Sequence, residues 1–268
     1  MARVAVSSLL VRPHPTPDAE KRILAVTPQR AQWRHVGFEV VHLEAGDAWR
    51  RETGERETCL VWLSGSCNVE TEGMRWRDMG GRRDVFDGPP QALYVPPRSW
   101  LKLVANASSE IAVGSAPAST GAKARRLQQA RVEIRGSGAS ERKIHHILME
   151  DEAAEALLVT EVLTPGGHWS SYPPHKHDEN DPPRETQLEE TYYHRLRDAR
   201  GFAVQRVYTA DRSLDESIAV RDGDLVLVPR GYHTVSAPPG YDLYYLNVMA
   251  GPVRRWCVTF DPEHERLR

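Results

Sequence analysis

The chain repeats itself, and this repeat restricts the folds that it can adopt. Two short motifs recur in its two halves at an offset of 133 positions: Glu57-Thr58 with Glu190-Thr191, and Val95-Pro96 with Val228-Pro229. Trp100 stands at the same offset from His233. Similarity at a fixed offset is typical of a duplicated structural unit. We therefore expect two domains of the same fold in tandem.

The second copy carries an insertion. Upstream of the shared motifs, Gly46 to Trp49 match Gly166 to Trp169 at an offset of only 120 positions. About 13 extra residues therefore lie between the Trp and the Glu of the second copy, since the later offset is 133. They fall on His175 to Leu188, the most polar and Pro-rich part of the chain.

The boundary between the copies is expected near residue 122. Pro117 to Arg126 is rich in Ala, Ser, Thr and Gly, which predicts a linker, and Gly136 to Ser140 predicts a turn at the entry to the second copy. We assign residues 1–122 to an N-terminal domain and residues 123–268 to a C-terminal domain.

Short strands are predicted throughout both copies. Runs rich in Val, Leu, Tyr and Thr are separated by Gly, Pro and Asp, for example Cys59 to Leu63, Leu225 to Val228 and Tyr244 to Asn247. Helical patterns are scarce, and the nearest candidate is the basic segment from Lys123 to Gln129. This pattern favours an all-β fold, either a sandwich or a barrel. Residues 1–6 are expected to form an edge strand, not a signal peptide.

The composition limits the classes of partner that the chain is expected to bind. Lys and Arg number 35 against 37 Asp and Glu, so a nucleic-acid partner is not expected. No apolar run approaches the roughly 20 residues that cross a bilayer, so a membrane partner is not expected either. The 3 cysteines show no C-x-x-C spacing, which favours a reducing, cytoplasmic location.

Three histidines and one glutamate form a candidate metal site in the second copy. His175 and His177 are separated by one residue, so on a strand they project from the same face, with Lys176 pointing away. Glu190 opens the next strand, and His233 follows a Val-Pro-Arg-Gly-Tyr corner. Such a mixed nitrogen and oxygen set suits Zn, Mn, Fe or Ni better than Ca or Mg.

Comparison with the first copy supports the interpretation of these histidines as ligands. A lone H-x-H pair is weak evidence, because histidines are often plain surface residues. The first copy, however, has no histidine between Trp49 and Glu57, and Trp100 stands at the position of His233. We therefore expect one divalent ion per chain, in the C-terminal domain, and an N-terminal domain filled with apolar bulk, including Trp100.

The same residues resemble a known family. H-x-H, then Glu, then Gly223-Asp224 through Pro229 to His233 resembles the cupin pattern. Further segments resemble the signature of the 5-deoxy-glucuronate isomerases of myo-inositol catabolism: Thr164 to Asp178, Leu188 to Tyr193, Gln205 to Tyr208, Pro229 to His233, Tyr244 to Gly251, Gly81 to Phe86 and Leu93 to Pro96. His168 departs from it, since Asn is expected there.

The resemblance implies a bicupin, with two jelly-roll β-barrels in tandem. It also implies the conversion of a small acidic sugar, 5-deoxy-glucuronate, to 5-dehydro-2-deoxy-gluconate, an aldose-to-ketose isomerisation. The related pectin-pathway isomerase of deoxy-uronates has a three-His, one-Glu site and is usually found with zinc. Zinc is therefore the first choice of metal, with Mn, Fe or Ni as alternatives, and a homo-oligomer is left open.

The catalytic and substrate-binding residues stay open at this point. Isomerisation removes a proton beside an aldehyde, and a divalent ion stabilises the resulting negative charge. The base is Glu190, Tyr172, Tyr192 or a metal-bound hydroxide. For the substrate carboxylate an arginine is expected, because its planar fork matches that group. The substrate-binding candidates are Arg184 in the inserted loop, with Arg206 and Arg230 as rivals, and Gln205, Tyr245 and Asn247 on strands.

Two other functions fit the same ligand set. Three His and one Glu also hold Fe(II) in cupin dioxygenases, which need oxygen, whereas an isomerase does not. A non-catalytic cupin that binds a sugar or stores metal is the other alternative. The polar insertion from His175 to Leu188 favours an enzyme, because a storage protein has little use for it.

Overall fold

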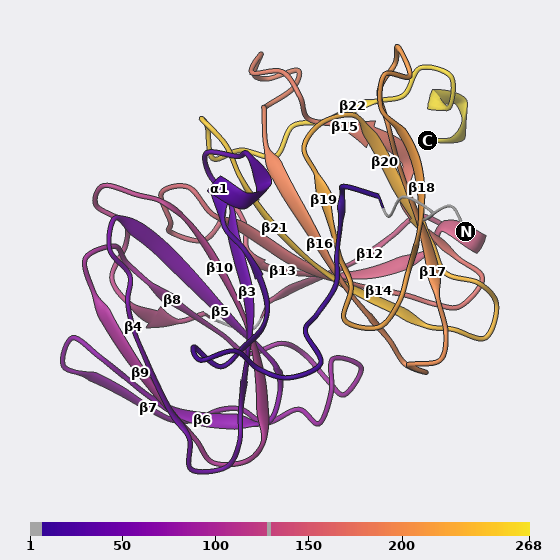
Figure 1. Ribbon diagram of the computed structural model, residues 1–268. Coiled ribbons are helices and arrows are strands. Elements are labelled where there is room, and N and C mark those ends of the chain that lie inside the picture. Colours follow the sequence, from indigo (N-terminus) through magenta and orange to yellow (C-terminus); the bar gives the residue numbers. More distant parts are fainter. Residues whose placement is uncertain (1–6, 128–129) are drawn as a thin grey trace, which may run out of the picture.

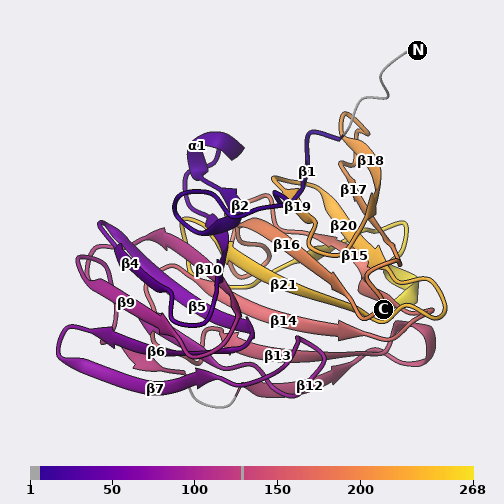
Figure 2. The same cartoon turned by 60° about the horizontal axis from the view of Figure 1, so that its bottom comes forward.

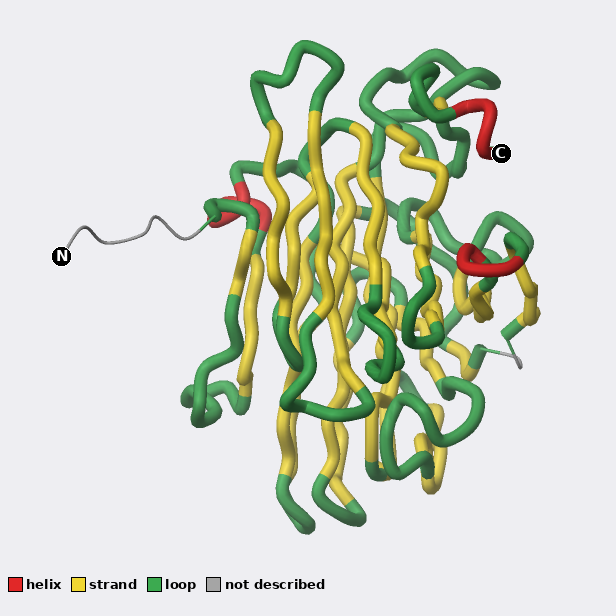
Figure 3. The backbone as a smooth tube through the Cα atoms, turned by 90° about the vertical axis from the view of Figure 1, so that its right-hand side faces the viewer, coloured by secondary structure: helices red, strands yellow, loops and turns green. Residues whose placement is uncertain are grey.

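The computed structural model describes residues 7–127 and 130–268, and strands make up about half of this part of the chain (Figures 1 and 3). The expected edge strand of residues 1–6 lies outside the described residues. Among those described, helix is limited to α1 (Pro28–Ala31) and to two 3-10 turns, Gly138–Ser140 and Glu265–Leu267. The prediction of an all-β fold is confirmed.

The first barrel is built from two antiparallel sheets. One has the strand order β11-β8-β5-β10-β3-β2 and the other β4-β9-β6-β7, which is jelly-roll topology. The strands are β2 (Arg22–Val26), β3 (Gly37–Leu43), β4 (Ala48–Glu52), β5 (Arg56–Ser64), β6 (Ser66–Thr71), β7 (Met74–Gly80), β8 (Ala92–Val95), β9 (Trp100–Ala105), β10 (Ser109–Pro117) and β11 (Arg125–Arg126).

The second barrel repeats this arrangement. Its sheets have the orders β1-β19-β16-β21-β14-β13-β12 and β18-β17-β20-β15-β22. The strands are β1 (Leu10–Val11), β12 (Arg131–Arg135), β13 (Arg142–Leu148), β14 (Leu158–Thr164), β15 (Trp169–Lys176), β16 (Glu189–Leu196), β17 (Ala203–Tyr208), β18 (Asp215–Val220), β19 (Leu225–Val228), β20 (Tyr232–Ser236), β21 (Leu243–Ala250) and β22 (Thr259–Phe260). The expected tandem of two barrels is confirmed.

The two larger sheets pack against each other, so the barrels lie side by side (Figure 1). Alternate residues of β5 serve different cores: Leu60 and Trp62 face the interior of the first barrel, whereas Val61 faces the second barrel. A sheet with both faces buried needs continuous apolar runs, which explains the sequence Cys-Leu-Val-Trp-Leu here. The packing is close, because a Cβ added to Gly114 would lie 2.9 Å from the side chain of Val248.

The barrels exchange their leading strands. β1 precedes the first barrel in the chain but pairs with β19 of the second (Figure 2). β11 precedes the second barrel but pairs with β8 of the first. The expected boundary near residue 122 is therefore crossed in both directions. The short loop between β10 and β11 lies within the expected linker, and the expected turn between Gly136 and Ser140 joins β12 to β13.

The strand register corrects the equivalence of the two copies by one residue. In the first barrel Thr58 pairs with Val95, and in the second Glu190 pairs with Val228. The structural partner of Glu190 is thus Thr58, and Glu57 corresponds to Glu189.

The expectation that Trp100 occupies the position of His233 is wrong for the same reason. Leu101 and Leu103 lie in the core of the first barrel, as Val235 lies in the core of the second. With these inward faces aligned, Trp49, which pairs with Leu103, corresponds to Ser170, which pairs with Val235, and the counterpart of His233 is Leu101. Leu101 is fully buried, whereas Trp100 is only partly buried, with the guanidinium of Arg50 5.1 Å from the centre of its ring. A shift of one residue along a strand exchanges the two faces of the sheet.

Two glutamates form reciprocal clamps between the barrels, and they support the corrected register. The carboxylate of Glu57 accepts hydrogen bonds from three successive backbone N–H groups, those of residues 155–157, at 2.6 to 2.9 Å. Glu189 accepts from the N–H groups of residues 34–36 at 2.7 to 2.9 Å. Each clamp reaches the segment that enters the other barrel, so the two contacts are related by the duplication.

A buried ion pair also joins the barrels. Arg82, from the Gly81 to Phe86 segment, donates two hydrogen bonds to Glu161 of β14, at 3.2 and 3.0 Å, and both side chains are almost fully buried. Glu161 further accepts a hydrogen bond from the hydroxyl of Tyr244 at 3.0 Å. Burial alone would raise the pKa of Glu161, but Arg82 and His145 outweigh it and lower that pKa. The carboxylate is therefore charged at neutral pH.

Candidate metal centre

Three of the four predicted ligands meet in the interior of the second barrel. The Nε2 atom of His177 lies 3.0 Å from a carboxylate oxygen of Glu190, and the Nε2 atom of His233 lies 3.2 Å from the same oxygen. His177 directly follows β15, Glu190 lies on β16 and His233 lies on β20. All three side chains are almost fully buried. Within the described part of the chain, they form the buried group whose ligand atoms lie within 4.8 Å of one another.

The second ring nitrogens orient both imidazoles. The Nδ1 atom of His177 lies 2.9 Å from the carbonyl oxygen of Leu188, and that of His233 lies 3.0 Å from the carbonyl oxygen of Gly231. A carbonyl oxygen only accepts, so each Nδ1 carries a proton and each ring turns Nε2 towards Glu190, where a metal ion would take the place of the proton on Nε2. Two ring nitrogens and a carboxylate that converge in a buried space suit a cation. The residues present therefore fit a divalent metal ion.

The pKa shifts of the site residues are consistent with a metal site. Burial alone would raise the pKa of Glu190, but hydrogen bonds with His177 and His233 outweigh it and lower the pKa to about 2. Glu190 is therefore an anionic ligand at neutral pH. For His177, burial lowers the pKa, but the bond to Glu190 outweighs burial and raises it.

His175 lies beside this group. Its ring centre is 4.6 Å from that of His233 and 6.3 Å from that of His177, and its ring also contacts Trp256 and Phe260 edge-on. Burial, followed by the neighbouring His233 and His177, lowers its pKa well below the ordinary value. A neutral imidazole at this place has a lone pair to give to a metal.

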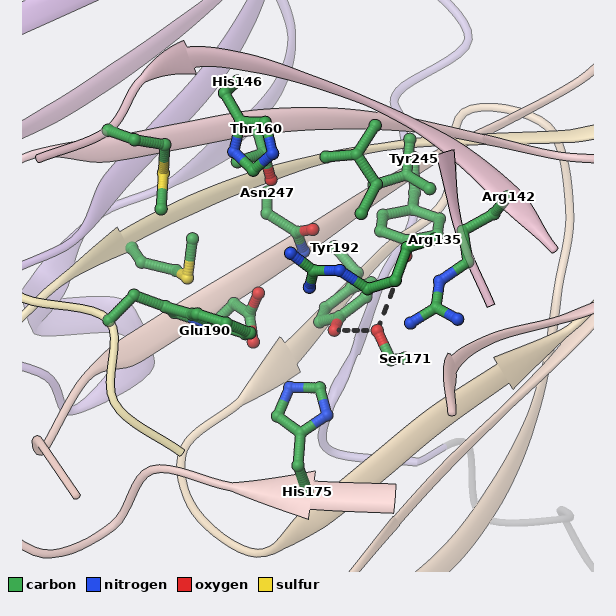
Figure 4. A pocket seen from close by; sticks show the side chains of 15 residues that line it. Arg135, Arg142, His146, Thr160, Ser171, His175, Glu190, Tyr192, Tyr245 and Asn247 are labelled. Atoms are coloured by element: carbon green, nitrogen blue, oxygen red, sulfur yellow. Dashed lines mark hydrogen bonds between the residues drawn. The ribbon is translucent and has the colours of Figure 1, made fainter. Parts of the chain in front are cut away.

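A pocket opens from the ligands (Figure 4). It is lined by predicted site residues and by several that the sequence analysis did not single out. The predicted ones are His175, Glu190, Tyr192, Tyr245 and Asn247. The others include Arg135, Arg142, His146, Thr160 and Ser171, with apolar side chains such as Ile144, Val162 and Met249.

Two tyrosines of the pocket form hydrogen bonds with serine hydroxyls. The hydroxyl of Tyr192 lies 2.8 Å from Oγ of Ser171, and that of Tyr245 lies 2.6 Å from Oγ of Ser170. Burial, together with the charge of Glu190, raises the pKa of Tyr192 well above its ordinary value. Tyr192 is therefore a neutral hydroxyl at physiological pH. The side-chain amide of Asn247 donates to the carbonyl oxygen of Thr191 at 3.2 Å.

The other predicted residues lie elsewhere. Arg184 is about half exposed and pairs with Glu179 and Asp181 at 2.7 and 2.9 Å. Arg206 pairs with Asp215 at 3.0 Å, and Arg230 contacts Ser213 at 3.4 Å.

None of these three arginines lines the pocket, and neither does the buried Gln205. Tyr172 lines an adjoining pocket that shares Arg135, Arg142, His175 and Trp256 with the first. Lys176 points to Glu185, at 2.8 Å, and His168 contacts the carbonyl oxygen of Glu141 at 2.8 Å.

The chain as a whole is similar to known proteins. The model of the KduI/IolB family matches residues 9–267, which is almost the whole chain. The chain belongs to the KduI/IolB family.

Members of the KduI/IolB family with the same overall length are similar over nearly their whole chains. The chain is 51% identical to the 5-deoxy-glucuronate isomerase of Geobacillus kaustophilus, over 96% of this chain and 95% of that one. It is 39% identical to the 5-deoxy-glucuronate isomerase of Bacillus subtilis strain 168, over 97% and 98% of the two chains.

Solved structures agree with the fold. An IolB-like protein from Salmonella typhimurium LT2 superposes with a TM-score of 0.93 at 42% identity, over 97% of this chain and 99% of that one. Oxalate decarboxylase from Bacillus subtilis superposes with a TM-score of 0.66 over 96% of this chain and 80% of that one. At 14% identity, the second likeness concerns the bicupin fold alone. No helix among residues 7–127 and 130–268 is long and apolar enough to span a membrane.

Proposed function

We propose that the chain is a 5-deoxy-glucuronate isomerase that works with one divalent metal ion. The observation that carries the proposal is the convergence of His177, Glu190 and His233 beside a pocket that Glu190 lines, in a chain 51% identical to an isomerase of that name. The resemblance noted in the sequence places the reaction in myo-inositol catabolism. The substrate is then a small acidic sugar.

His175 is proposed as the fourth ligand. It lines the same pocket, lies against His233 and is almost fully buried. Zinc is the first choice for three imidazoles and one carboxylate, with Mn, Fe and Ni as alternatives. When bound, such an ion supplies a Lewis acid that stabilises negative charge on the substrate oxygens.

The side chains of the pocket suggest how the proton moves. The reaction takes a proton from the carbon beside the aldehyde and returns one to the aldehyde carbon. With a pKa of about 2, Glu190 is a weak base, so we assign it to the metal. Tyr192, neutral and held by Ser171, is suited to donate a hydrogen bond to a substrate oxygen. Tyr172, which borders the adjoining pocket, is the other candidate for proton transfer.

A metal and activity assay tests the proposal. Protein reconstituted with Zn²⁺ should hold about one ion per chain, because among the described residues the buried group of His177, Glu190 and His233 has no counterpart in the first barrel. It should convert 5-deoxy-glucuronate to 5-dehydro-2-deoxy-gluconate, followed by NMR, equally well with and without oxygen. Treatment with a chelator should stop the reaction, and adding metal back should restore it.

The same assay separates the alternatives. Activity that requires oxygen would indicate a cupin dioxygenase. Metal and sugar binding without any turnover would indicate a non-catalytic cupin. About two ions per chain, or none after reconstitution, would contradict the single site.

A further inference from the structure

Arg142 is a buried cation without a carboxylate partner among the described residues. It opens β13 and is 7% exposed. Its guanidinium donates to two backbone carbonyls, that of Ser140 at 2.9 Å and that of Tyr172 at 3.5 Å. Arginines are almost never fully buried unless they are paired, since an uncompensated charge away from water is costly.

The other buried arginine among the described residues and the other arginine of this pocket are both compensated. Arg82 is buried against the charged Glu161. Arg135, which lines the same pocket as Arg142, donates two hydrogen bonds to Glu133 at 2.7 and 3.0 Å and lies over the ring of Trp256. The charge of Arg135 is thus used within the protein, whereas that of Arg142 is not.

Arg142 faces the space where a substrate would lie. It lines the pocket together with His175 and Glu190, and it also lines the adjoining pocket bordered by Tyr172 and Phe260. Figure 4 shows its guanidinium and the carboxylate of Glu190 on opposite sides of the pocket, with Ser171 between them in this view. An anion that enters this space meets a cation on one side and the metal ligands on the other.

We propose that Arg142 binds the carboxylate of the sugar acid and thereby holds the aldehyde end of the substrate at the metal ligands. The inference rests on the proposed isomerase function. A guanidinium has five N–H donors in a planar fork, of which the two carbonyl contacts occupy two, so donors remain for a bidentate bond to a carboxylate. The incoming carboxylate also supplies the counter-charge that the buried cation lacks.

The first test measures the preference for an acid. Wild type, Arg142→Gln, Arg142→Lys and the matched control Arg135→Gln are assayed on 5-deoxy-glucuronate and on 5-deoxy-glucose, which carries a neutral CH₂OH in place of the carboxylate. Wild type should prefer the acid strongly. Arg142→Gln should lose roughly 100-fold in kcat/KM on the acid, mostly through KM, and little on the neutral sugar. Arg142→Lys should recover part of the preference, and Arg135→Gln should keep most of it.

A structural role for Arg142 would give a different pattern. It would lower kcat/KM on both sugars by the same factor, and Arg142→Gln would then retain the preference for the acid, which overturns the proposal. Metal content and thermal melts of each variant show whether the site and the fold are intact. If Arg142→Gln does not fold, the preference for the acid is compared between wild type and Arg142→Lys, because lysine keeps the positive charge but lacks the planar guanidinium.

A binding measurement separates this proposal from the proposed function. Titration calorimetry of zinc-loaded protein with D-glucuronate and with D-glucose needs no turnover. Wild type should bind the acid more tightly, and Arg142→Gln should bind the two sugars alike. Equal binding of the acid by both proteins overturns the role of Arg142, whether or not the isomerase assay succeeds. Absence of turnover in wild type, with an Arg142-dependent preference for glucuronate, overturns the isomerase function alone.

Discussion

The two barrels have the same strand order but fill their interiors differently. Where the second barrel has Glu190 and His233, the first has Thr58 and Leu101. Where the second has Tyr192 and His194, the first has Leu60 and Trp62 on the corresponding strand. The comparison shows that the same jelly roll accommodates either an apolar interior or a group of candidate ligands. It leads us to expect that changes in the first barrel affect stability and changes in the second affect chemistry.

Removing a ligand should produce the largest difference between the barrels. His233→Ala should lose turnover by roughly 1000-fold, because a bound metal contributes several kcal/mol to stabilising the transition state. Its metal content should fall as well, as measured by elemental analysis. The stability of the metal-free protein should change little, and it must be compared without metal, since a bound ion raises apparent stability. Near wild-type turnover in this variant would mean that the ligand set is wrong.

The matching change in the first barrel should act on stability. Leu101→Ala removes a fully buried side chain at the position of His233, so it should lower the free energy of unfolding by about 2–5 kcal/mol in metal-free denaturant melts. The metal content of the folded protein should not change.

Trp100→Ala is the control for Leu101→Ala. The ring of Trp100 is only partly buried, so this change should cost less than Leu101→Ala despite the larger side chain. A greater loss in Trp100→Ala would restore the equivalence that the repeated motifs suggested, with Trp100 at the position of His233.

The reciprocal clamps should show the smallest difference between the barrels. Glu57→Gln replaces charge-assisted hydrogen bonds to residues 155–157 with neutral ones, and it should cost about 1.5–3 kcal/mol in the free energy of unfolding. Glu189→Gln should cost a similar or smaller amount, because Glu57 is fully buried and Glu189 is only partly buried. Both changes should leave the metal content unaltered. An unchanged free energy of unfolding in Glu57→Gln would show that this contact does not stabilise the packing of the two barrels.

Much of this difference could be predicted from the sequence. The repeat predicts two domains of the same fold in tandem. The candidate ligands can be predicted as well, because the H-x-H pair and the Glu and His that follow it form a recognisable motif. The register could not be predicted to within one residue. The dipeptide Glu-Thr recurs at Glu57 and Glu190, but the glutamates that correspond are Glu57 and Glu189, and sequence identity does not tell which face of a strand a residue occupies.

Arg142 could not have been found by motif. It lies far upstream of His175, just after the turn that joins β12 to β13, and the sequence around it has no recognised pattern. It reaches the pocket because β13 joins β14 and β21 in the same sheet. The sequence favours Arg184 because it lies in the inserted loop, but in the structure it pairs with carboxylates of that loop.

The exchange of β1 and β11 has a consequence for the origin of the chain. If each half were a separate polypeptide, the same pairing would hold two subunits together as a domain-swapped dimer. The chain therefore has the architecture of such a dimer fused head to tail, with the loop between β10 and β11 as the joint. We infer that an ancestral homodimer had two equivalent sites. After fusion, each half could change its sequence separately, although the two barrels still shared strands. The first half could therefore lose its ligands while its β1 strand still completed the second barrel.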